Sequence, residues 1–280
     1  MDSTHRLADG VTLHIQTWPA PQPRGTVLIV HGLGEHIGRY AHVAAALNAW
    51  GWNVVGDDHR GHGGSEGARG AIPDAEALLR DLGELIDRAR KLFPGPLVVL
   101  GHSLGGLIAA RFVAEGTLES PARWYREVDG LVLSSPALDA GMNGFQKLLL
   151  GVLGPLAPNL AVGNGLKSAW ISRDPAVVAA YDADPLVHDR VTPRLARFIV
   201  DGGAFVQAQA PKWQMPTLLM WAGADRCVAP RGSEAFAAAA PAALVKAREF
   251  KPMAHEIFND PEKQQVFDTL AAWLVPRAAA

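Results

Sequence analysis

The feature that most constrains the fold of this chain is a short apolar segment that runs into a serine between two glycines. Leu97–Leu100 is unbroken and apolar, which is typical of a strand buried on both faces of a parallel sheet. It leads into Gly101-His102-Ser103-Leu104-Gly105, and the apolar residues that follow, 107–113, suit a helix. A chain that turns this abruptly strains its central residue, and flanking glycines remove the Cβ atoms that would clash. The pattern predicts a strand, a sharp turn and a helix, with the Ser103 hydroxyl exposed.

The same five letters also occur by chance, and then mark only a glycine-rich turn. The strand before and the helix after favour a nucleophile instead, because the first amides of that helix, beginning with the Leu104 N–H, then point at whatever is bonded to the hydroxyl. We therefore expect Ser103 to be a catalytic nucleophile.

Strand and helix patterns alternate along most of the chain, which predicts an α/β protein with a mostly parallel central sheet flanked by helices. The expected strands are 11–18, 26–30, 52–56, 97–100, 128–133, 216–221 and 244–250, and the other expected helices are 39–50, 73–93, 233–239 and 261–274. The stretch between the expected strands 128–133 and 216–221 carries scattered glycines and prolines and no strong strand pattern. We expect a core of residues 1–135 and 213–280, with 136–212 inserted as a mainly helical cap.

Composition excludes several classes of protein. The 280 residues suffice for one large α/β domain, and 26 basic against 28 acidic residues argue against a nucleic-acid partner. Cys227 is the only cysteine, so an intramolecular disulfide and a cysteine-rich metal site are excluded. The chain starts without a signal-peptide pattern and lacks the run of about twenty apolar residues that a membrane span needs. We expect a soluble, cytoplasmic protein.

A serine hydroxyl is a weak nucleophile and needs a base, which is in turn oriented by an acid. In a sheet of this kind, the acid and then the histidine follow later strands. Asp225 follows the expected strand 216–221, and His255 follows 244–250. Asp225 could instead be an ordinary turn aspartate. Asp139, after the preceding strand, is the rival acid.

The oxyanion that forms when the serine attacks needs two hydrogen-bond donors. Leu104 N–H is one, and Leu33 N–H is the natural second, because His31-Gly32-Leu33-Gly34 is a glycine-bearing loop that directly follows a buried strand.

A cluster of histidines and aspartates can also be considered as a metal site. Its members are His31, His59 and His62 with Asp57 and Asp58. Their spacing matches no zinc motif, and a serine mechanism makes a metal unnecessary. We therefore expect neither a metal nor a cofactor, and we interpret His102 as supporting structure.

Several stretches together match one known family. They are 31–36 with Arg39-Tyr40, 58–67, 101–106, 181–186, 223–226 and His255-Glu256. With these the chain resembles the monoacylglycerol lipases and lysophospholipase-like hydrolases, which are also grouped with the serine aminopeptidase-like α/β hydrolases. The match at 181–186 is the most specific, because a generic α/β hydrolase would not share cap sequence.

The resemblance implies an α/β-hydrolase fold with the cap inserted after the sixth strand, a lid over an elongated acyl pocket, and hydrolysis of a glycerol monoester. It places Glu35 and Arg39 near the glycerol end and Tyr181 at the pocket wall. Mammalian relatives carry a second histidine three residues past the catalytic one, where this chain has Phe258. The polar end of the site is where we expect a difference.

An apolar stripe at helical spacing lies in the expected cap and consists of Phe145, Leu148, Leu149, Val152 and Leu153. It could pack onto the body of the protein, or it could form a lid that touches acyl chains through Phe145 and Leu149 and contacts a membrane surface transiently.

The sequence thus predicts a serine hydrolase that cleaves lipid esters of glycerol. A lysophospholipase or broad carboxylesterase of the same fold, and a binding protein without catalysis, remain as alternatives. The oligomeric state is left open.

Overall fold

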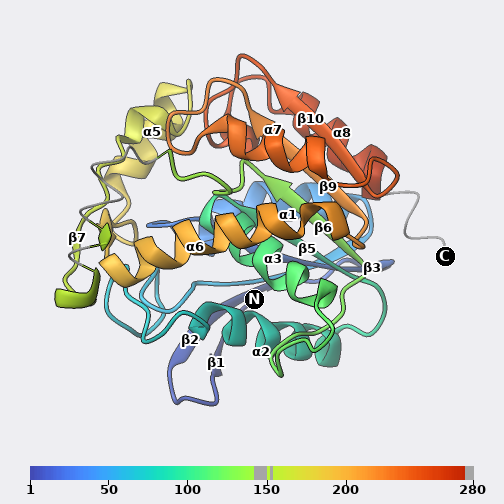
Figure 1. The fold of residues 1–280 in the computed structure, drawn as a ribbon. Helices are drawn as coiled ribbons and strands as arrows, with labels where there is room; N and C mark the ends of the chain where they lie inside the picture. The colour runs from blue at the N-terminus through green and yellow to red at the C-terminus, as the bar shows by residue number, and fades with distance from the viewer. Residues whose placement is uncertain (142–149, 152–153, 275–280) are drawn as a thin grey trace.

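The protein is described by a computed structural model that covers residues 1–141, 150–151 and 154–274 (Figure 1). The predicted apolar stripe, including Phe145 and Leu149, lies outside the described residues.

An eight-stranded sheet with the order β1-β2-β4-β3-β5-β6-β9-β10 forms the centre of the molecule. β2 is antiparallel to β1 and to β4, and every later neighbour in that order is parallel. This confirms the mostly parallel sheet. The strands are β1 Asp2–Arg6, β2 Thr12–Trp18, β3 Gly25–Val30, β4 Trp52–Asp57, β5 Leu97–His102, β6 Gly130–Ser134, β9 Thr217–Ala222 and β10 Val245–Phe250.

Helices cover both faces of the sheet, so the fold has three layers (Figure 1). Side chains of α1 and α8 pack on one face, and those of α2, α3, α6 and α7 on the other. Within β5, Leu97 and Val99 join one core cluster while Val98 and Leu100 join the other, as the alternation of a strand requires. The helices are α1 Ala41–Ala49, α2 Ala77–Leu92, α3 Leu104–Ala114, α5 Pro175–Ala183, α6 Pro193–Gln209, α7 Pro230–Ala239 and α8 Gln264–Leu274.

One strand of the central sheet was not expected from the sequence. β1, which reads Asp-Ser-Thr-His-Arg, has no apolar residue and is largely exposed. It exists because its backbone pairs with β2 at the edge of the sheet, an interaction that hydrophobic patterning does not reveal.

The stretch between β6 and β9 mixes two kinds of structure. β7 Val162–Gly163 and β8 Arg190–Val191 form a short antiparallel pair, and α5 lies close to it in sequence. In contrast, α6 packs along α3 and places Leu195, Phe198 and Val206 in the main core. The division into a core and a 136–212 cap stays a prediction.

Among the described residues, we find no helix with both the length and the apolar character that crossing a bilayer would require.

Candidate active site

The turn at Ser103 has the strained geometry that the sequence predicts. Ser103 joins β5 to α3 with φ 53° and ψ −117°, a conformation that a residue with a side chain rarely adopts. A Cβ atom built on Gly101 would overlap the carbonyl oxygen of Gly105, and one built on Gly105 would overlap those of Val30 and His31. Both flanking positions therefore require glycine.

Asp225 and His255 meet at the same edge of the sheet. They follow β9 and β10, which are parallel neighbours, so their loops emerge side by side. His255 Nδ1 lies 2.7 Å from Asp225 Oδ2. The other carboxylate oxygen, Oδ1, accepts the amides of Cys227 at 2.8 Å and Val228 at 3.0 Å. Asp225 is thus fixed by three hydrogen bonds.

Burial and charge oppose each other in this pair. Burial disfavours both charged forms, but the attraction and hydrogen bond between the two groups prevail, so the pKa of His255 is raised and that of Asp225 is lowered. Because Nδ1 donates to Asp225, Nε2 is the basic atom of the His255 ring.

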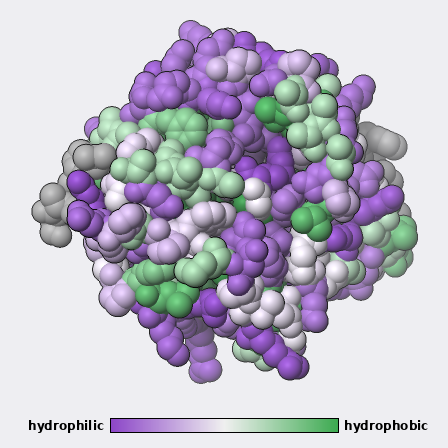
Figure 2. All heavy atoms as spheres, turned by 180° about the vertical axis from the view of Figure 1, so that it is seen from behind, coloured by the Kyte–Doolittle hydropathy of each residue, from purple (hydrophilic) through white to green (hydrophobic). Residues whose placement is uncertain are grey.

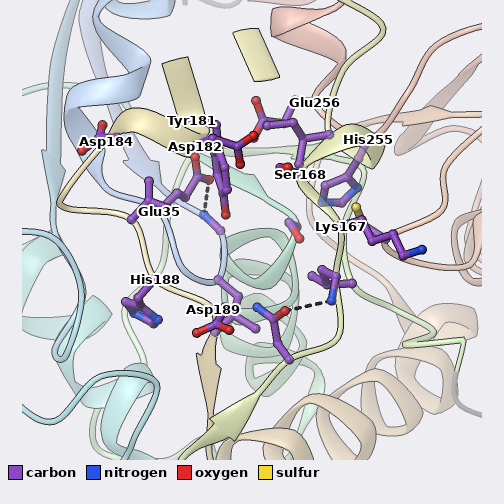
Figure 3. Close-up of a pocket in the computed structure, with 18 of the residues that line it drawn as sticks. Glu35, Lys167, Ser168, Tyr181, Asp182, Asp184, His188, Asp189, His255 and Glu256 are labelled. Atoms are coloured by element: carbon purple, nitrogen blue, oxygen red, sulfur yellow. Dashed lines mark hydrogen bonds between the residues drawn. The ribbon is translucent and has the colours of Figure 1, made fainter. Parts of the chain in front are cut away.

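Ser103 and His255 line one cavity of about 400 Å³. Figure 3 shows its polar wall, with Glu35, Tyr181 and Glu256 on one side and His188 and Asp189 on another. Among the described lining residues, five carry carboxylates and one is a lysine: Glu35, Asp182, Asp184, Asp189, Glu256 and Lys167. The charged side chains that line this polar cavity are therefore mainly acidic.

A second cavity of about 480 Å³ shares Ser103 and Leu33 with the first. Its described lining is more apolar and includes Leu104, Ala137, Trp170, Val191, Ile199 and Val228. Ser103 consequently lies at the junction between this apolar cavity and the polar one.

The loop after β3 lies directly against the serine. A Cβ atom built on Gly32 would come within 3.2 Å of Ser103 Cβ. The Gly32 N–H donates to Glu35 Oε1 at 2.6 Å, which directs this amide away from an oxyanion on the serine. Leu33 lines both cavities, and Leu104 is the first residue of α3, where amides lack partners within the helix. Both residues with a predicted donor thus line a cavity together with Ser103, and the role of their amides stays a prediction.

A buried ionic network lies behind the polar cavity. Arg39 donates to Glu35 and, through two nitrogens at 2.7 Å each, to both oxygens of Glu256. Burial alone would lower the pKa of Arg39, but the two carboxylates raise it, so the guanidinium stays charged. It also lies 4.8 Å from the ring centre of Tyr181, which lines the cavity. Arg39 therefore holds cavity residues in place rather than lining the cavity itself.

The rival acid is engaged elsewhere. Asp139 Oδ2 accepts from Arg231 Nε at 2.7 Å, whereas His255 pairs with Asp225. His102 donates to or accepts from Ser134 Oγ at 3.1 Å, and burial and the nearby His255 lower its pKa to about 4.

Sequence reasoning assigned no role to Glu256. Its position next to His255 was the available signal, but its ion pair with Arg39 joins distant parts of the chain and cannot be read from spacing.

One group of described residues has the side-chain atoms that a metal would need. Asp225, Cys227 and His255 bring theirs within 4.8 Å of one another. However, Asp225 and His255 are already hydrogen-bonded to each other, and burial and the Asp225 charge raise the pKa of the Cys227 thiol. Because the thiolate is the ligand form, a protonated thiol fits a metal poorly.

Comparison with known proteins shows the family to which the chain belongs. Residues 21–262 match the family described as "Serine aminopeptidase, S33". The chain is 36% identical to the monoacylglycerol lipase of Mycolicibacterium smegmatis, over 98% of this chain and 97% of that protein. It is 31% identical to phospholipase YtpA of Bacillus subtilis, over 92% and 97% of the two chains.

The crystal structure of Paleococcus ferrophilus monoacylglycerol lipase superposes with a TM-score of 0.84 at 35% identity, covering 95% of this chain and 99% of that one. The α/β-hydrolase fold predicted from the motifs is thereby confirmed. The chain belongs to the serine aminopeptidase S33 family of hydrolases, as the resemblance of its motifs predicted.

Proposed function

We propose that this protein is a serine ester hydrolase that cleaves carboxylic esters of glycerol, as a monoacylglycerol lipase does. The observation that carries the proposal is the position of Ser103, which shares one cavity with His255 and stands where that polar cavity meets an apolar one. An ester with a long acyl chain and a small polar alcohol matches this division. The names of two similar proteins, both monoacylglycerol lipases, support it.

In the proposed mechanism, His255 Nε2 takes the proton of Ser103 as Oγ attacks the ester carbonyl carbon. The resulting oxyanion accepts hydrogen bonds from the amides of Leu33 and Leu104. When the carbonyl reforms, the C–O bond to glycerol breaks and the alcohol leaves with the proton from His255. Water then repeats the attack on the acyl-enzyme, which releases the fatty acid and restores the serine.

The charge of the polar cavity favours a neutral alcohol over an anionic head group. Arg39 pairs with Glu35 and Glu256, but Asp182, Asp184 and Asp189 against Lys167 still leave an excess of carboxylates among the described lining residues, which would repel the phosphate of an anionic lysophospholipid. Glu35 and Tyr181, held by Arg39, are the proposed groups at the glycerol end. This favours a monoacylglycerol lipase over a lysophospholipase, which remains the second candidate because of the similarity to phospholipase YtpA.

The test replaces Ser103 with alanine. Ser103→Ala should lose nearly all hydrolysis of monoacylglycerols and all labelling by a fluorophosphonate probe, with an unchanged circular dichroism spectrum. Turnover that survives this replacement would remove Ser103 as nucleophile.

A panel of monoacylglycerols, lysophosphatidylglycerol and p-nitrophenyl esters of matched chain length should show the anionic lipid as the poorest substrate. A preference for it would instead favour the lysophospholipase.

We also propose transient contact of the cap with a lipid surface, and a cytoplasmic location. Several large apolar side chains of the described cap residues are exposed, namely Leu156, Leu160, Val162, Leu166 and Leu186. Figure 2 shows one face of the molecule, which is largely hydrophilic and on which hydrophobic side chains form separate patches.

A further inference from the structure

The ring of His31 is held in one tautomer by two backbone groups. His31 follows β3 and is fully buried. Its Nε2 lies 2.9 Å from the amide nitrogen of His59, and its Nδ1 lies 2.8 Å from the carbonyl oxygen of Gly32. An amide N–H only donates and a carbonyl oxygen only accepts, so Nε2 carries the lone pair and Nδ1 carries the hydrogen. The ring is therefore neutral and donates to Gly32.

The ring of His59 packs against the ring of His31 and helps to fix it. The two rings are stacked with their centres 3.9 Å apart. His59 Nε2 lies 2.9 Å from the carbonyl oxygen of His31, and its Nδ1 lies 3.1 Å from Asp57 Oδ2. Both nitrogens face acceptors, so His59 is the charged member of the pair. Burial and this neighbouring charge hold the pKa of His31 well below its usual value, which agrees with the neutral tautomer.

The peptide between Gly32 and Leu33 is fixed as a consequence. The described residues contain no cis peptide bond, and in a trans peptide the C=O and the following N–H point in opposite directions. The Gly32 oxygen is held by His31, the Gly32 N–H by Glu35 at 2.6 Å, and the Gly34 oxygen by the amide of His188 at 2.9 Å. Holding the Gly32 oxygen therefore also sets the direction of the Leu33 N–H.

We propose that His31 is a positioning residue for catalysis, which keeps the Gly32–Leu33 peptide turned so that the Leu33 N–H faces the oxyanion. This inference rests on the proposed function, because it concerns an acyl transfer at Ser103. His31 acts without touching the substrate. If its hydrogen bond is lost, the peptide can rotate, and a rotated peptide presents an oxygen lone pair where the developing negative charge needs a donor.

Two substitutions separate the two nitrogens of His31. In His31→Asn, the side-chain amide can place its nitrogen where Nδ1 was and still donate to Gly32. In His31→Gln, the longer side chain reaches the position of Nε2 and can still accept from His59, but leaves the Gly32 oxygen without its donor. The two variants are both neutral, polar and slightly altered in size, so a purely structural role predicts similar losses in each.

The measurements are kcat and KM for p-nitrophenyl butyrate, and the inhibition constant of an alkyl trifluoromethyl ketone, which forms a tetrahedral adduct with the serine. His31→Gln should lower kcat by about 10- to 100-fold, below the roughly 100- to 1000-fold loss of a whole donor, with KM little changed. Its affinity for the ketone should fall by a similar factor. His31→Asn should stay within about threefold of the unaltered protein, and His5→Gln on β1 serves as the distant control.

Equal losses in His31→Asn and His31→Gln, or a fall in kcat without a fall in ketone affinity, would overturn the role of His31. Failure of the proposed function has a different signature, because the unaltered protein would then neither hydrolyse the ester nor bind the fluorophosphonate at Ser103. Circular dichroism checks that each variant is folded. The test then depends only on the difference between His31→Asn and His31→Gln.

Discussion

His255 must be neutral to accept the proton of Ser103, so its pKa sets the acid side of the activity profile. Burial lowers this pKa, but the charge of Asp225 and the hydrogen bond to it raise the pKa above the ordinary 6.5. As the pH falls through the raised value, His255 becomes protonated and activity is lost. The acid limb of kcat/KM for the unaltered protein should therefore lie above pH 6.5.

Replacing Asp225 tests whether its charge outweighs burial in setting the pKa of His255. In Asp225→Asn the attraction disappears while the burial of His255 remains, so the acid limb of kcat/KM should move to lower pH. The rate should also fall by about 10⁴-fold, because an amide no longer fixes the useful tautomer. A pH profile of kcat/KM for p-nitrophenyl butyrate measures both effects, and Asp139→Asn is the matched control that should leave them unchanged. An unmoved acid limb would mean that another group orients His255.

At this scale the sequence reveals some residues and hides others. Ser103, Asp225 and His255 could be predicted because each directly follows an apolar strand, and the topology of parallel strands brings such positions to one edge. The contacts of Arg39 with Glu256, and of His31 with His59, could not be predicted, because they depend on side-chain directions and on which loops adjoin.

At the scale of elements, the junction of β5 and α3 depends on glycine. Gly105→Ala places a Cβ atom against the carbonyl oxygens of Val30, the last residue of the neighbouring strand β3, and of His31 directly after it, and this backbone cannot withdraw easily. We expect a loss of about 3 kcal/mol in the free energy of unfolding, or failure to fold. Urea unfolding measures this loss of free energy.

Gly202→Ala on α6 is the matched control for that substitution. The added Cβ would meet Leu107 Cδ1 at 3.5 Å, an ordinary contact, and alanine favours a helix. Its free energy of unfolding should stay within about 1 kcal/mol of the unaltered protein or rise. Equal destabilisation by both substitutions would argue against a specific steric requirement at Gly105.

Elements with a strong hydrophobic period could be predicted, and those without one could not. β5 and β9 each contain an unbroken apolar run and were expected, although β5 extends to His102 because its backbone continues to pair with β6. β1 could not be predicted from hydrophobic pattern because its residues are polar. The packing of α6 on α3 could not be predicted either, since glycines interrupt the apolar pattern of α6.

At the scale of the whole molecule, buried histidines couple stability to pH. The pKa is lowered in His31, His42, His62, His102 and His188, and it is raised in His59 and His255. A histidine of the first group contributes fully above pH 6.5, and its contribution is lost below that value, because only the unfolded chain takes up the proton. The two histidines of the second group act in the opposite direction, since their contribution is lost as the pH rises through the raised value.

Because the first group is larger, the protein should be less stable at pH 5.5 than at pH 7.5. We expect the free energy of unfolding to decrease between pH 7.5 and pH 5.5. Urea unfolding at constant ionic strength checks this expectation. Constant or increasing stability on acidification would show that the raised histidines dominate.

The acidic lining of the polar cavity also bears on how a catalytic cycle ends. On the proposed function, a neutral ester enters and a carboxylate is generated at Ser103, in a cavity that already contains Asp182, Asp184 and Asp189. Like charges repel, most strongly where water is scarce. We therefore expect the newly made fatty acid to be repelled from the cavity, so that accumulated product competes poorly with fresh substrate.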